Sequence, residues 1–157
     1  KNNEEEKVEI DGFTAVLNED MTPVLYLNGE RRPFTPKGEG MYIWVSLSPD
    51  KTKLLFNFRG LETYVSDLNG KILFSAGRLN APAWLTNDII IGMEDHDDGY
   101  LVISSDLVAY SLVTGAKRNL TRTEDRAEMY PFPLPGGRGL VFSTSEGELY
   151  IMKIKLR

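Results

Sequence analysis

The stretch Ser48–Phe56, which reads SPDKTKLLF, is a polar turn that leads directly into an apolar run. A second copy of this pattern, LPGGRGLVF, spans Leu134–Phe142. The two copies lie 86 residues apart, and Tyr64 and Tyr150 are separated by the same 86 residues. A looser third copy, APAWLTNDIII, lies between them at residues 81–91. The chain is therefore built from a repeated unit about half of 86 residues long.

Short apolar runs recur along the chain, and three of the four follow these turns. The runs are Leu54–Phe56, Ile89–Ile91, Tyr100–Ile103 and Leu140–Phe142, and each is bounded by Gly, Pro, Asp or Asn. Strands with apolar side chains on both faces are typical of propeller blades, which are covered by a neighbour on each side. The unit length of about 40 to 45 residues also fits a four-stranded blade. The sequence therefore predicts an all-β fold of four-stranded antiparallel blades, in an incomplete ring of about three and a half blades, with essentially no helix.

Three motifs extend this prediction to a family. Ser48–Asp50 forms a Ser-Pro-Asp turn, Tyr64–Gly70 and Tyr110–Gly115 place a tyrosine strand before a glycine turn, and Leu120 and Thr121 close a unit. In these motifs the chain resembles the TolB-like, or WD40-like (PD40), β-propeller repeat family, with Lys51 in place of the family's glycine. The resemblance implies a module that binds proteins of the cell envelope in a periplasmic or otherwise exported location. A chain without cysteine is equally compatible with the cytoplasm.

The repeat register also predicts the domain organisation. Residues 1–7, KNNEEEK, are polar and charged, so we expect a disordered tail. Residues 8–157 are expected to form a single partial propeller domain. Its blades are predicted at approximately 8–35, 41–75, 80–121 and 128–157. The first lacks its opening strands, and the fourth ends at its third strand.

Composition excludes several classes of function. The net charge of −5 and the pI near 5.0 argue against a nucleic-acid partner, which would select a clustered basic surface. No run approaches the roughly 20 apolar residues of a membrane span, so no membrane insertion is expected. The absence of cysteine excludes a disulfide framework and cysteine-based metal sites.

An acidic segment gathers the only histidine with four carboxylates. Its members are Glu94, Asp95, His96, Asp97 and Asp98. Such residues can bind Ca²⁺ or Mn²⁺, which makes the segment a weak candidate for a metal site. However, it precedes Gly99 between two apolar runs, where Asp-Asp-Gly is common in hairpins. We therefore expect an exposed, metal-free turn.

Other catalytic and cofactor sites find no support in the sequence. A Gly-x-Ser-x-Gly elbow is missing, and His96 would be the only histidine base. The glycine-rich turn Gly136–Gly139 precedes a strand and not a helix, so it does not predict a phosphate site. We predict no catalytic residue and no cofactor.

Four aromatic residues lie on or just before the expected innermost strands, namely Trp44, Trp84, Tyr130 and Phe132. They have two interpretations. Aromatic side chains pack well between blades. Alternatively, one or two of them line the rim or channel of the propeller and contact a partner.

The repeats predict a non-catalytic propeller module for protein or ligand binding, and the resemblance to TolB-like repeats implies that it is part of a larger cell-envelope propeller protein. The alternative is the propeller part of a serine peptidase-like hydrolase or of a polysaccharide lyase, although metal-dependent lyases of this architecture use several histidines. We expect a protein partner, and a ring completed by another segment of the parent chain or by a second copy in a homodimer. Phe56 and Phe142, at equivalent repeat positions, are expected to be buried between blades.

Overall fold

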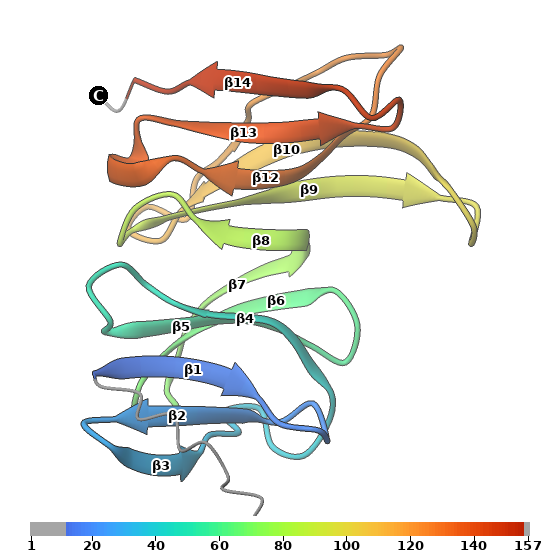
Figure 1. The fold of residues 1–157 in the computed structure, drawn as a ribbon. Coiled ribbons are helices and arrows are strands. Elements are labelled where there is room, and N and C mark those ends of the chain that lie inside the picture. The colour runs from blue at the N-terminus through green and yellow to red at the C-terminus, as the bar shows by residue number, and fades with distance from the viewer. Residues whose placement is uncertain (1–11, 156–157) are drawn as a thin grey trace, which may run out of the picture.

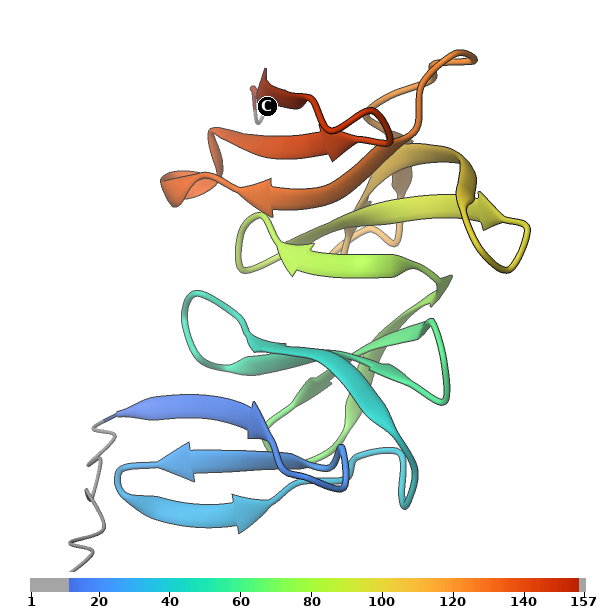
Figure 2. The same ribbon diagram turned by 45° about the vertical axis from the view of Figure 1, so that its right-hand side comes forward.

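The computed structural model describes residues 12–155, and within this range the fold is all-β. Four antiparallel sheets of three or four strands stack face to face into an open arc (Figure 1). The first and last sheets lie at opposite ends of the stack, as the rotated view also shows (Figure 2). The predicted fold class is confirmed. The expected disordered tail, residues 1–7, lies outside the described residues.

Each sheet is a meander in which consecutive strands pair. The first contains β1 (Phe13–Leu17), β2 (Pro23–Leu27) and β3 (Glu30–Pro33), and the second β4 (Tyr42–Leu47), β5 (Lys53–Phe58), β6 (Glu62–Asp67) and β7 (Ile72–Arg78). The third contains β8 (Asn80–Trp84), β9 (Ile89–Asp97), β10 (Val102–Ser111) and β11 (Lys117–Asn119), and the fourth β12 (Glu128–Pro133), β13 (Gly139–Thr144) and β14 (Leu149–Lys153). A single 3₁₀ turn, η1 (Pro135–Gly137), joins β12 to β13, and no helix of the described residues is long and apolar enough to cross a membrane.

The 86-residue repeat is visible in the strands. β4 and β12 begin and end 86 residues apart, and so do β5 and β13. In the first sheet β1 lies against β4, as β5 lies against β8 and β9 against β12. Strand β1 therefore occupies a second-strand position, and the innermost position of that sheet holds no strand among the described residues.

The Ser-Pro-Asp turn between β4 and β5 is closed by its own side chains. The Ser48 hydroxyl accepts hydrogen bonds from the Thr52 and Lys53 amides at 3.2 and 3.0 Å. The Asp50 amide donates to Asn87 Oδ1, 2.9 Å away in the corresponding turn between β8 and β9. Equivalent turns of neighbouring blades are therefore joined directly.

The core lies between the sheets and not on one side of them. Because strand residues alternate faces, Leu54 and Phe56 pack toward the first sheet, whereas Leu55 packs toward the third. Phe142 joins the cluster between the third and fourth sheets. Phe56 is 0% exposed and Phe142 is 6% exposed, which confirms the burial predicted for both residues.

Candidate functional site

The innermost strands β4, β8 and β12 share a bulge. Their pairing with the next strand shifts register between Ile43 and Ser46, between Asn80 and Ala83, and between Met129 and Phe132. Each bulge contains one non-glycine residue in the left-handed region, with φ of 51° at Trp44, 45° at Ala81 and 52° at Tyr130. Bulges redirect side chains, and this backbone conformation is unfavourable for residues other than glycine. The repeated bulge therefore changes the direction of the inner-strand side chains at the same point of each blade.

These bulges border a hollow between the three inner strands, with a volume of about 470 Å³. All four predicted aromatic residues line it, together with Val45, Ser46, Ala81, Pro82, Ala83, Pro131 and Pro133. An adjoining hollow of about 520 Å³ shares Trp84, Phe132 and Pro133 and extends to the turns at Pro49, Asn87 and Gly136. We call the two hollows together the aromatic groove.

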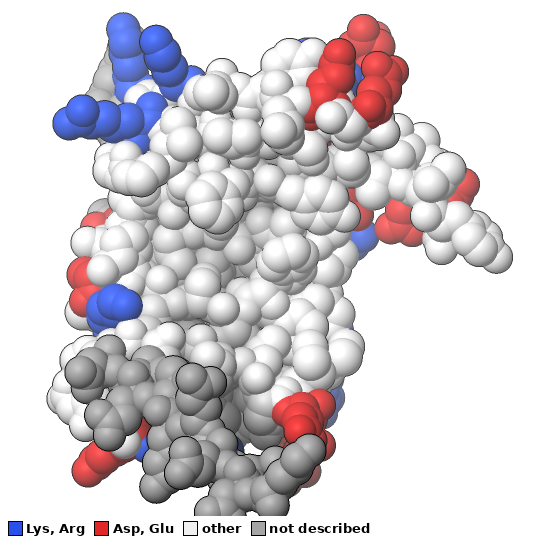
Figure 3. Space-filling view, in the orientation of Figure 1, with Lys and Arg blue, Asp and Glu red and all other residues white. Residues whose placement is uncertain are grey.

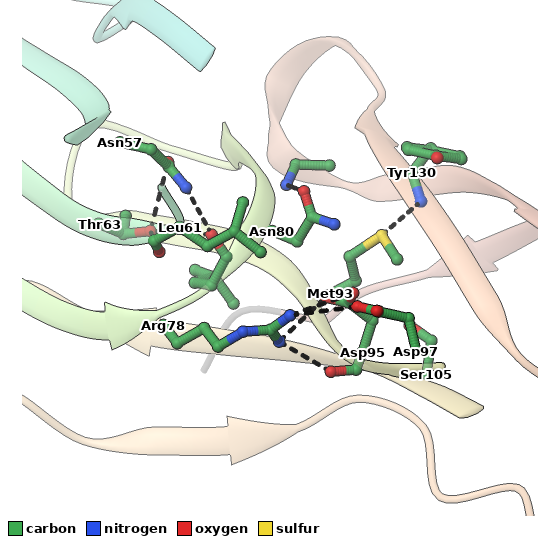
Figure 4. A network of polar contacts seen from close by, with 12 residues as sticks. Asn57, Leu61, Thr63, Arg78, Asn80, Met93, Asp95, Asp97, Ser105 and Tyr130 are labelled. Carbon is green, nitrogen blue, oxygen red and sulfur yellow. Dashed lines mark hydrogen bonds and ion pairs between the residues drawn. The ribbon is translucent and has the colours of Figure 1, made fainter. Parts of the chain in front are cut away.

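The four aromatic side chains differ in burial. Trp84 is buried, and its indole Nε1 donates to the Ser46 carbonyl at 3.2 Å, so packing accounts for this residue. Trp44 and Tyr130 are about half exposed, at 45% and 52%, and Phe132 is exposed. The Tyr130 amide lies 3.4 Å from Met93 Sδ, which holds the β12 bulge against β9 (Figure 4). Three aromatic side chains are thus accessible to a ligand, and the contact with Met93 fixes the backbone of the β12 bulge.

The aromatic groove is uncharged. Among the described residues no Asp, Glu, Lys, Arg or His lines either hollow. Uncharged residues fill the middle of the face shown in Figure 3, and charged side chains gather at its margins. Of the residues that the structure describes, Tyr130 alone brings a titratable group, its phenol, to the lining.

The acidic segment differs from the expected turn. Strand β9 continues to Asp97, which pairs with Val102, so Glu94–Asp97 belong to a strand and not to a loop. The turn itself begins at Asp98, whose Oδ1 accepts the Leu101 and Tyr100 amides at 2.9 Å each. These hydrogen bonds, first from Leu101 and then from Tyr100, lower the pKa of Asp98.

Strand alternation distributes these carboxylates over two faces. Asp95 and Asp97 lie on the Arg78 side, with Asp95 Oδ1 at 3.4 Å and Asp97 Oδ2 at 3.7 Å from that guanidinium (Figure 4). Glu94 instead accepts Lys117 Nζ at 2.6 Å, and this hydrogen bond is the main cause that raises the pKa of Lys117. Within residues 12–155 no three His, Asp or Glu side chains converge as metal ligands would.

The tip of the β9–β10 hairpin is a feature that the sequence pattern did not predict. The run Tyr100–Ile103 was expected to be strand throughout, but β10 begins only at Val102. Tyr100 is 95% exposed, and Leu101 and Ile103 are also exposed. The hydrogen bonds to Asp98 hold Tyr100 and Leu101 in the turn, which explains the difference from the apolar pattern.

Comparison with known proteins gives information about the fold and not about the function. No family model matches the chain, and no curated protein matches it. A crystal structure of the computationally designed Ika4 protein superposes with a TM-score of 0.61 at 12% identity, over 99% of this chain and 96% of that chain. An oligogalacturonate lyase in complex with manganese superposes with a TM-score of 0.53 at 15% identity, over 87% of this chain and 46% of that chain. The fold is propeller-like. At such identities the likeness extends to the fold alone, and the chain spans less than half the length of that lyase.

Proposed function

We propose that this chain is a non-catalytic propeller module that binds a protein or another ligand in the aromatic groove. One observation carries the proposal: four aromatic residues from three blades line a hollow that no charged side chain lines among the described residues. Exposed aromatic side chains in a concave site are typical of binding sites.

The chemistry of the groove supports binding over catalysis. General acid-base catalysis uses positioned His, Asp, Glu, Lys, Cys or Tyr side chains, and among the described residues Tyr130 is the only one of these that lines either hollow. His96 lies on the β9–β10 hairpin and lines neither hollow. The likeness to a lyase concerns the fold and does not favour the alternative of a hydrolase or lyase.

We further propose that the blades are TolB-like repeats in an exported, cell-envelope protein. The side-chain-closed turn at Ser48–Asp50 supports the repeat assignment. The open arc supports a ring that another segment of the parent chain or a second copy completes, because the terminal sheet exposes Leu149 and Ile151.

A selection experiment tests the binding function. A random peptide library displayed on phage is selected on the wild-type chain, and an array of neutral oligosaccharides is probed in parallel. The expected binders lose about tenfold or more in affinity for Trp44→Ala and for Tyr130→Ala. If no binder depends on either side chain, the groove is not the binding site.

Activity assays test the other half of the proposal. Peptide and oligogalacturonate substrates are incubated with the wild-type chain and with His96→Ala. The expected rates equal the buffer background for both proteins. Robust turnover that His96→Ala abolishes would overturn the non-catalytic assignment.

A further inference from the structure

We infer that the ligand of the aromatic groove is an uncharged, proline-rich segment of a partner protein, bound in the polyproline II conformation. The inference rests on the proposed binding function and names its ligand class. Three features support it: the lack of charged side chains in the groove among the described residues, the prolines in strands β8 and β12, and the exposed hydrogen-bond donors of Trp44 and Tyr130.

The charge of the groove selects against anionic ligands. Nucleic acids, acidic oligosaccharides and anionic lipid headgroups need lysine or arginine at the site, and among the described residues neither hollow contains one. A charged peptide side chain would lose its hydration there without gaining a partner. The groove therefore favours a neutral segment.

The backbone of β8 and β12 selects against an added β-strand at their edges. Among the described residues β4, β8 and β12 are edge strands that pair along one side, and residues of all three line the hollow. Pro82, Pro131 and Pro133 interrupt the amide donors of β8 and β12, and a proline cannot donate to a strand ladder. A polyproline II segment does not need that ladder, because its backbone makes no regular hydrogen bonds.

Exposed donors and flat rings in the groove fit the groups that such a segment offers. Trp44 carries an indole N–H and Tyr130 a hydroxyl, and both side chains are about half exposed and line the hollow. Both groups can donate to the ligand's backbone carbonyls, and aromatic surfaces accept proline rings in other polyproline-binding grooves. The Trp84 ring also lines the groove, and its hydrogen bond to the Ser46 carbonyl fixes its position.

Calorimetric titration with defined peptides tests the inference. The probes are acetylated, amidated decaproline and a Gly-Ser peptide of equal length. Decaproline should bind at least about tenfold more tightly, because it is already ordered in the bound conformation. Trp44→Ala should weaken its binding about tenfold or more, and Tyr130→Phe, which removes only the hydroxyl, about threefold to tenfold. Val113→Ala, at an exposed site on the turn between β10 and β11, should leave binding unchanged.

The outcomes separate this inference from the function on which it rests. Equal affinity for the two peptides, absence of decaproline binding, or indifference to both groove substitutions would overturn the inference. If groove-dependent binders from the phage library or the glycan array lack proline, the binding function stands and the ligand class is wrong. Circular dichroism melts show whether Trp44→Ala folds, and if it does not, Tyr130→Phe decides.

Discussion

Asp50 organises the Ser-Pro-Asp turn through one carboxylate oxygen. Its Oδ1 accepts the Ser48 hydroxyl at 2.6 Å, the Thr52 hydroxyl at 2.8 Å and the Thr52 amide at 3.1 Å. These contacts, led by the hydrogen bond from Ser48, lower the pKa of Asp50 from 3.8 to about 2. The ionised form is thus the one that the folded turn prefers.

A pH-dependent loss of stability follows. Because the folded pKa lies below the ordinary value, the contribution of the Asp50 charge is fully present above about pH 4 and is lost as the pH falls toward 2. Its size should be less than about 1 kcal/mol, since solvent screens this partly exposed group. Urea titrations should show Asp50→Asn less stable than wild type at pH 6 but equal to it near pH 2. The exposed Asp20→Asn is the control, and an equal deficit of Asp50→Asn at both pH values would contradict the assignment.

Lys51 stands in the same turn with φ of 63°, in the region where glycine is favoured. Lys51→Gly should therefore stabilise the fold by about 0.5–1 kcal/mol, despite losing an exposed hydrogen bond from Lys51 Nζ to the Phe13 carbonyl. Lys71→Gly, at a position without positive φ, should destabilise it. Chemical denaturation measures the free energy of unfolding of both variants. A loss of stability in Lys51→Gly would show that the positive φ of Lys51 does not destabilise the fold.

At the level of elements, the fold depends on packing between sheets. Phe56→Ala and Phe142→Ala should each cost about 3–5 kcal/mol, because each removes a buried ring from the cluster between two sheets. Tyr100→Ala, at the exposed hairpin tip, should change the free energy of unfolding by less than about 0.5 kcal/mol. Guanidinium denaturation compares the three variants. Losses below about 1 kcal/mol for both phenylalanines would mean that the core lies elsewhere.

Strands that follow a turn with recognisable residues could be predicted from the sequence, whereas the bulges of the inner strands and the acidic end of β9 could not. The turn at Pro49 and its counterpart at Pro135 marked the strands that follow, because turn chemistry is local. The bulges at Trp44 and Tyr130 were not predicted, because neither position carries the glycine that usually indicates a positive φ. The two residues nevertheless lie 86 residues apart, at equivalent repeat positions. Similarly, the acidic end of β9 is a strand because pairing with β10 overrides its weak propensity. For the groove, the aromatic residues were identified in advance, but their convergence required the arrangement of three blades.

At the scale of the whole molecule, the open arc leaves the outer face of the last sheet without a neighbouring sheet among the described residues. Phe132, Val141 and Ile151 lie opposite one another across β12, β13 and β14, so they share a face. Leu149 and Ile151 are 75% and 71% exposed. An apolar face of this kind is typical of an interface, which supports a completed ring.

Sedimentation tests completion by a second copy. At micromolar concentration the 157-residue chain should sediment as a dimer, and Ile151→Asp should convert it to a monomer. Val113→Asp is the matched control, because Val113 is 77% exposed but lies on the turn between β10 and β11. A folded, non-aggregating wild-type monomer would show that no second copy completes the ring.

The β9–β10 hairpin also has a practical consequence. Its two strands are the longest in the described chain, and its tip carries Tyr100 at 95% exposure, away from the aromatic groove. Exposed loop tips tolerate inserted sequence, because no buried backbone must move. A peptide tag or fluorescent label inserted between Gly99 and Tyr100 should therefore leave the fold and the groove intact, and would provide an attachment point for immobilising the chain in binding measurements.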